Sequence, residues 1–227
     1  MQKGFTTFSY VMLFIYIIFS LGSCYFNLKG KKSEKAFLKL FLMPTLTLFY
    51  ILTFKNYKIF VLLALLFSWF GDIILIKHNT KNVILGILFF STACVFYTVS
   101  MIGIVKFTEL NYILTIFVFV ICFVVPFFIN SFIREYSSKI LKRNVHFSYI
   151  YGFCIGLLLA MSLLVLTSNY RPEKIYLFFG SMLLLISSVF VGYLVFYKQN
   201  KIANAILMLT YTVAQFLLVS GFGYIFR

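Results

Sequence analysis

The sequence predicts an all-α polytopic membrane protein, an eight-helix transmembrane bundle, and three observations lead to this fold class. First, 63% of the 227 residues are hydrophobic and 11% are charged, whereas soluble domains are about half apolar and a quarter charged. Second, the apolar residues gather in eight runs of the length that a membrane-spanning helix needs, about 20 residues. Third, these runs are rich in bulky Leu, Ile and Phe and lack the alternation of β-barrel strands.

The eight predicted spans follow one another closely along the chain. They cover residues of roughly 5–26, 37–54, 59–76, 83–105, 112–132, 148–168, 175–197 and 204–225. Backbone groups in lipid must find hydrogen-bond partners within their own segment, so each run is expected to be a helix. The links are short and carry no further domain. Residues 1–227 are therefore expected to form a single transmembrane domain with antiparallel neighbours.

The Lys and Arg residues of the links predict the orientation. The links that follow odd-numbered spans hold twelve of these residues, and the other links together with both tails hold seven. The positive-inside rule then places the odd links in the cytoplasm and both termini outside it. We expect an integral protein of the cytoplasmic membrane, which is the inner membrane in a bacterium. The oligomeric state stays open.

The net charge of +15 could suggest a nucleic-acid partner. The basic residues, however, lie in short links between apolar runs and do not form one domain face. Such links contact anionic lipid headgroups, so we expect membrane lipids as partners and no nucleic acid. None of the four cysteines is in a CxxC pair or beside a histidine. The sequence therefore predicts no metal site and no cofactor.

Asp72 is the strongest candidate for chemistry. Of the five acidic residues, it alone falls within a predicted span. A carboxylate in the hydrocarbon region costs about 3 kcal/mol or more unless it is paired, hydrated or protonated, and such residues are functional candidates. Lys39, near the start of the second span, lies at a similar depth, so an ion pair with Asp72 is open. The alternatives are that Lys39 extends to the interface and that Asp72 only locks helices together.

Six other polar side chains within the spans are candidates for contacts with a lipid substrate or for interhelical hydrogen bonds. These residues are Tyr97, Tyr151, Ser187, Ser188, Tyr211 and Gln215. Tyr211 and Gln215 are four residues apart, so they are expected to share one helix face.

Several short stretches fall in successive spans with a familiar order and spacing. They are Lys39 with Met43-Pro44, residues 65–72, Gly86 with residues 90–97, Tyr151 with Met161, Gly180 with Ser187, and Tyr211 with Ala214-Gln215. In this order the chain resembles the YhhN-like family, the lysoplasmalogenase-type membrane proteins. The resemblance implies an eight-span enzyme that hydrolyses the vinyl ether bond of lysoplasmalogen to a fatty aldehyde and a glycerophospho head group. It also implies that Asp72 and Lys39 are catalytic and that the six polar residues contact the substrate.

Three positions depart from the family pattern. Ser188 stands where a second aspartate is expected, Cys94 where many members have histidine, and Leu40 where a proline usually follows the lysine. Vinyl ether hydrolysis needs a proton donor to carbon and a base that steers water, and a serine hydroxyl is a poor acid. The resemblance therefore implies weak activity or none, which a Ser188→Asp substitution is expected to raise.

Two functions of other classes remain open beside the hydrolase. One is a non-enzymatic lipid-binding or transporter-like protein, and the other is a structural membrane subunit. Released aldehyde from lysoplasmalogen favours the enzyme, and binding without turnover favours the second function. A structural subunit is favoured if the protein neither binds nor cleaves lysoplasmalogen and another protein co-purifies with it stably.

Overall fold

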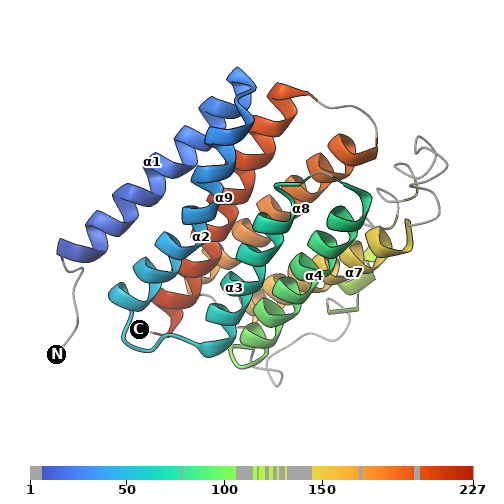
Figure 1. Ribbon diagram of the computed structural model, residues 1–227. Coiled ribbons are helices and arrows are strands. Elements are labelled where there is room, and N and C mark those ends of the chain that lie inside the picture. The colour runs from blue at the N-terminus through green and yellow to red at the C-terminus, as the bar shows by residue number, and fades with distance from the viewer. Residues whose placement is uncertain are drawn as a thin grey trace.

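The computed structural model of the protein is a bundle of roughly aligned α-helices (Figure 1). It describes residues 7–77, 79–105, 145–168, 171–196 and 200–226, with scattered positions between 115 and 131. The helices in these ranges are α1 (Thr7–Lys29), α2 (Lys32–Thr53), α3 (Ile59–Ile74), α4 (Thr80–Ile102), α7 (Val145–Thr167), α8 (Lys174–Phe196) and α9 (Lys201–Ile225). No strand occurs in the described ranges, which agrees with the predicted all-α class.

Seven of the eight predicted spans coincide with these helices. Six of the helices are long and apolar enough to cross a membrane, so the chain is an integral membrane protein with several spans. The predicted fifth span, 112–132, lies outside the described residues except for scattered positions. The described part of the chain therefore supports six long spans. The other two predicted spans are the third, which is the short helix α3, and the fifth, which lies mostly outside the described residues.

Helix α3 is shorter than predicted. It has 16 residues and ends at Ile74 rather than at residue 76, so it is about 24 Å long and shorter than the roughly 30 Å of a hydrocarbon core. Its last turn is closed by the amide of Leu75, which donates to the Gly71 carbonyl, and by Asn82 Nδ2, which donates to the Ile74 carbonyl at 3.3 Å. These donors satisfy carbonyls that the end of a helix leaves free.

The helices close into a ring. Chain neighbours pack together from α1 through α4 and from α7 through α9, while α4 packs on α7 (Figure 1). Helix α9 completes the ring because it packs on α8, α1 and α2. Thirteen of the 25 residues of α9 are buried, so most polar side chains on this helix must find partners within the protein.

Two glycines bring α8 and α9 very close together. A Cβ atom at Gly180 would lie 3.0 Å from the backbone nitrogen of Leu218, and one at Gly221 would lie 3.1 Å from that of Leu177. Both distances are shorter than ordinary van der Waals contact, so these positions require glycine. Small residues that let backbones approach are typical of helix contacts in membranes. This contact fixes α9 against the wall from which Ser187 projects.

The two ends of the bundle differ in charge. Helices α2, α4, α7 and α9 begin at the end where α1, α3 and α8 finish (Figure 1). We call this end the basic end, after the lysines that its described residues carry: Lys29, Lys31, Lys35, Lys77, Lys81 and Lys201. Helix α1 begins and α9 finishes at the opposite end. Helices α4 and α7 are parallel, as an odd number of spans between them would require.

We predict that the basic end faces the cytoplasm and that both termini lie outside it, because the lysines are concentrated in the links of that end. Topology reporters fused at each terminus and inserted in the link between α3 and α4 measure this. A cytoplasmic C-terminus with an external α3–α4 link would overturn the orientation. Termini on opposite sides of the membrane would refute the even span count.

Candidate functional site

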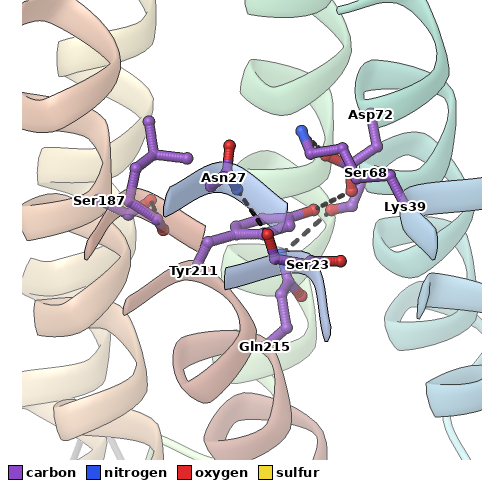
Figure 2. Close-up of polar contacts among 9 residues, drawn as sticks. Ser23, Asn27, Lys39, Ser68, Asp72, Ser187, Tyr211 and Gln215 are labelled. Carbon is purple, nitrogen blue, oxygen red and sulfur yellow. Dashed lines mark hydrogen bonds and ion pairs between the residues drawn. The ribbon is translucent and has the colours of Figure 1, made fainter. Parts of the chain in front are cut away.

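Asp72 lies at the centre of a buried polar cluster that joins α2, α3 and α9 (Figure 2). Lys39 Nζ donates to Asp72 Oδ1 at 3.1 Å, and the Tyr211 hydroxyl donates to Oδ2 at 2.9 Å. The side chains of Asp72 and Lys39 are only 3% and 12% exposed. Each carboxylate oxygen therefore has its own donor, which is the condition for keeping a carboxylate in a water-poor interior. The Lys39–Asp72 pair that the sequence left open is present.

A proline in α2 leaves room for a second bond between α2 and α3, next to the ion pair. Pro44 has no amide hydrogen, so the carbonyl of Leu40, four residues earlier in α2, loses its usual helical partner. The indole Nε1 of Trp69 donates to this carbonyl at 2.8 Å. Trp69 lies three residues before Asp72 on α3, and Leu40 follows Lys39 on α2. The Trp69–Leu40 bond therefore holds the two helices together one turn from the ion pair.

A second set of hydrogen bonds lies one turn away from Asp72. Gln215 Nε2 donates to Ser68 Oγ at 3.3 Å, and the fully buried Tyr97 donates to Gln215 Oε1 at 2.6 Å. Ser68 precedes Asp72 by four residues on α3, and Tyr211 precedes Gln215 by four residues on α9. Helices α3 and α9 are thus joined by two contacts one turn apart, Asp72–Tyr211 and Ser68–Gln215. This agrees with the prediction that Tyr211 and Gln215 share one helix face.

The Tyr211 ring is held by helix α4. Phe90 packs edge-on against it, with the ring centroids 5.8 Å apart. Phe90 can reach this place because residue 71 is glycine: a Cβ atom there would lie 2.9 Å from the Phe90 ring. Gly71 directly precedes Asp72, so the same turn of α3 admits the aromatic ring and presents the carboxylate.

Lys39, Asp72 and Tyr211 line a cavity of about 40 Å³ near the basic end. Tyr151 and Ser187 add hydroxyl groups to its lining. The other lining side chains are apolar: Leu75, Val83, Ile87, Phe90, Val191 and Leu207. At about 10–15 Å³ for each water, the cavity has room for about three waters.

The structure distributes the six predicted substrate-contact residues unequally. Tyr151, Ser187 and Tyr211 line the cavity, whereas Tyr97 and Gln215 form the second set of bonds farther from the basic end. Ser188 is not among the lining residues; its hydroxyl donates to the Leu185 carbonyl of its own helix at 2.6 Å. One residue turns a helix by about 100°, so Ser187, and not Ser188, occupies the position from which a second carboxylate would face Asp72.

Sequence reasoning missed Ser68 and Trp69 as parts of this site. A signal existed for each. Ser68 is four residues from Asp72 and so shares its helix face. Pro44 lacks an amide hydrogen, which indicates that the carbonyl of residue 40 needs a hydrogen-bond donor from elsewhere, and Trp69 is that donor. Among the described residues, no group of three His, Cys, Asp or Glu side chains could hold a metal ion. The acid–base groups that line the cavity are Lys39, Asp72 and the two tyrosines.

We predict that Asp72→Asn lowers thermal stability in detergent, because it leaves the Lys39 ammonium buried without its counterion, at a cost of about 3–5 kcal/mol. Adding Lys39→Met is expected to recover part of this loss, because replacing both partners removes the unpaired charge. The measurement is a double-mutant cycle of unfolding midpoints. Strictly additive losses would show that the two residues are not coupled.

Comparison with known proteins agrees with this geometry. A family model described as the YhhN family matches residues 34–222. The match includes Lys39, Asp72 and Tyr211 and leaves out helix α1. Searches of curated proteins and of solved structures found no match. Because the family model covers most of the chain, the protein belongs to the YhhN family.

Proposed function

We propose that the protein is a lysoplasmalogenase-type hydrolase of low activity, which cleaves the vinyl ether bond of lysolipids inside the membrane. One observation carries the proposal: the Lys39–Asp72–Tyr211 cluster lines a cavity whose remaining wall is mostly apolar. A proton-transfer group beside an apolar wall suits a substrate whose reacting carbons belong to a lipid chain. Membership of the YhhN family supports the same reading.

The depth of Asp72 suits a bond next to the lipid head group. Asp72 precedes the end of α3 by two residues, a rise of about 3 Å, and that end belongs to the basic end of the bundle. A vinyl ether joins the chain directly to glycerol, close to the phosphate. Lysines of the basic end attract anionic phosphate, so a lysolipid held with its head there brings its vinyl ether to the depth of Asp72.

The Lys39–Asp72 contact can supply the proton. Transfer of a proton from Lys39 Nζ to Asp72 Oδ1 converts the ion pair into a neutral amine and a carboxylic acid without changing the charge of the pair. The proposed reaction requires this transfer to occur across the 3.1 Å contact when a lipid is bound beside the pair. Tyr211 continues to hold Oδ2 and so fixes the direction in which Oδ1 points.

The reaction then follows from the chemistry of vinyl ethers. Asp72 gives its proton to the vinyl carbon that is not bound to oxygen, the double-bond electrons form the new C–H bond, and an oxygen lone pair forms an oxocarbenium ion. The Asp72 carboxylate accepts a proton from water while the water oxygen bonds to the cationic carbon. The resulting hemiacetal breaks its carbon–oxygen bond and releases a fatty aldehyde and the glycerophospho alcohol. One water is consumed, and Asp72 regains its proton.

We infer low activity because Asp72 is the one carboxylate among the described residues that line the cavity. Ser187, on the opposite wall, donates to the Leu207 carbonyl at 3.3 Å and can hold a water but not accept its proton. Asp72 must therefore act as acid and as base in turn. The same observation favours one alternative, a lipid-binding protein without turnover, in which the apolar wall receives a chain and the cluster holds the helices together.

We predict that Asp72→Asn reduces aldehyde release from lysoplasmalogen by at least about 100-fold, the low end of what general acid–base groups contribute. Wild type and variant are compared at equal concentrations of folded protein. Glu173→Gln, the same change at the opposite end of the bundle, is the matched control and is expected to keep full activity. Full activity in Asp72→Asn would remove Asp72 from the mechanism, and binding of lysoplasmalogen without aldehyde from wild type would favour the alternative.

We predict that Ser187→Asp raises aldehyde release by up to about 100-fold, because it places a second acid–base group on the cavity wall. Ser188→Asp, which the family resemblance led us to expect would raise activity, makes the same chemical change on a side chain that does not line the cavity. From the structure we now expect it to leave the rate unchanged. Rates are measured at equal folded concentration, since a new buried carboxylate also destabilises. A gain from Ser188→Asp without a gain from Ser187→Asp would contradict the orientation of α8.

A further inference from the structure

The fully buried side chains of helix α1 all carry a polar group, although Met12, Leu13 and Phe19 of the same helix are partly buried against the hydrophobic core. Its buried side chains are those of Ser9, Tyr16, Ser20, Ser23 and Asn27. Their spacing of seven, four, three and four residues places them on one side of the helix, while large apolar side chains such as Phe14 and Leu21 are exposed on the other. Apolar packing alone would not require this arrangement, because hydroxyl groups are costly to bury without partners.

Two of these side chains meet at one residue of α9. The Tyr16 hydroxyl donates to the Thr212 carbonyl at 2.7 Å, and Ser20 Oγ lies 2.7 Å from Thr212 Oγ1. Thr212 is buried, and its hydroxyl also donates to the Leu209 carbonyl. The Tyr16 ring further stacks on Phe216, one turn along α9, with the ring centroids 6.5 Å apart. Helix α1 thus holds α9 at residues 212 and 216.

Residues 212 and 216 directly follow the two residues that α9 presents to α3. Tyr211 reaches Asp72 and Gln215 reaches Ser68, while Thr212 and Phe216 lie about 100° further around the helix. Helix α9 is therefore held on two adjacent faces, by α3 and by α1. A rotation that withdraws Tyr211 from Asp72 must also break the bonds from Tyr16 and Ser20 to Thr212.

We propose that Tyr16 and Ser20 are positioning residues for the site: through Thr212 they set the rotation of α9 that keeps the Tyr211 hydroxyl on Asp72. Hydrogen bonds are directional, so they fix a rotation that apolar contact would leave looser. The significance for catalysis rests on the proposed function. The positioning itself concerns the Asp72–Tyr211 contact and holds whether or not the protein turns over a lipid. Tyr16 and Ser20 lie outside the family match, whereas Thr212 lies inside it.

The test uses the fact that Asp72 is the only aspartate in the sequence. Protein made with [4-¹³C]aspartate and placed in lipid vesicles gives one isotope-shifted carboxyl absorption in its infrared difference spectrum. Tyr211→Phe removes the hydroxyl that donates to Oδ2 and so defines the band position of an Asp72 without this bond. Tyr16→Phe and Ser20→Ala are each expected to move the band toward that position, and the double variant is expected to move it farther.

Two control variants separate positioning from general destabilisation. Ser23→Ala makes the same change as Ser20→Ala on the same face of α1, but the buried Ser23 hydroxyl has no hydrogen-bond partner among the residues that the structure describes, so the band is expected to stay in place. Ser20→Thr keeps the hydroxyl and is expected to keep the wild-type band. A band at the wild-type position in both Tyr16→Phe and Ser20→Ala, whatever their stability, would overturn the proposal. Aldehyde release is measured separately, so its absence would count against the hydrolase and not against the positioning.

Discussion

A carboxylate in the hydrocarbon region is costly unless it is paired, hydrated or protonated, and much of this bundle follows from how the protein pairs Asp72. Asp72 obtains one donor from α2 and one from α9, so three helices meet at its two oxygens. Losing these partners would leave a bare charge, which costs several kcal/mol in such surroundings. The hydrophobic effect does not drive helices together within lipid. Specific polar contacts of this kind can therefore determine which helices are neighbours and at what rotation they face each other.

The features around Asp72 are consistent with this requirement. Pro44 frees a carbonyl on α2 that Trp69 of α3 takes up, one turn from the ion pair. Gly71 makes room for the ring of Phe90, which in turn holds the ring of Tyr211. The cavity beside the cluster has a mostly apolar lining. Asp72 is the one carboxylate among the described residues that line it. The same arrangement that stabilises a buried charge thus places one carboxylate beside a small cavity whose lining is mostly apolar.

The positions of the helices could be predicted from the sequence, whereas most contacts between residues far apart in the sequence could not. Runs of about 20 apolar residues placed seven helices, because lipid leaves an apolar segment few alternatives. The Lys39–Asp72 pair was accessible because both charges lie at one depth. The sequence named both Ser187 and Ser188 as candidates and could not tell them apart, because it does not show how α8 is rotated and one residue changes the direction by about 100°. The structure places Ser187, and not Ser188, among the residues that line the cavity. The bonds of α1 to Thr212 join residues more than 190 positions apart, and no local pattern indicates that pairing.

The central claim is that one lysine ammonium rests on the only aspartate of this protein inside the membrane. Solid-state NMR of vesicle-embedded protein, labelled with ¹³Cγ-aspartate and ¹⁵Nζ-lysine, measures this contact directly, since a single aspartate gives a single carboxyl signal. The account predicts strong dipolar dephasing of that signal by ¹⁵N in the wild type, with loss of the dephasing in Lys39→Met and its retention in Lys35→Met. A carboxyl signal that shows no ¹⁵N dephasing in the folded wild type would contradict the account.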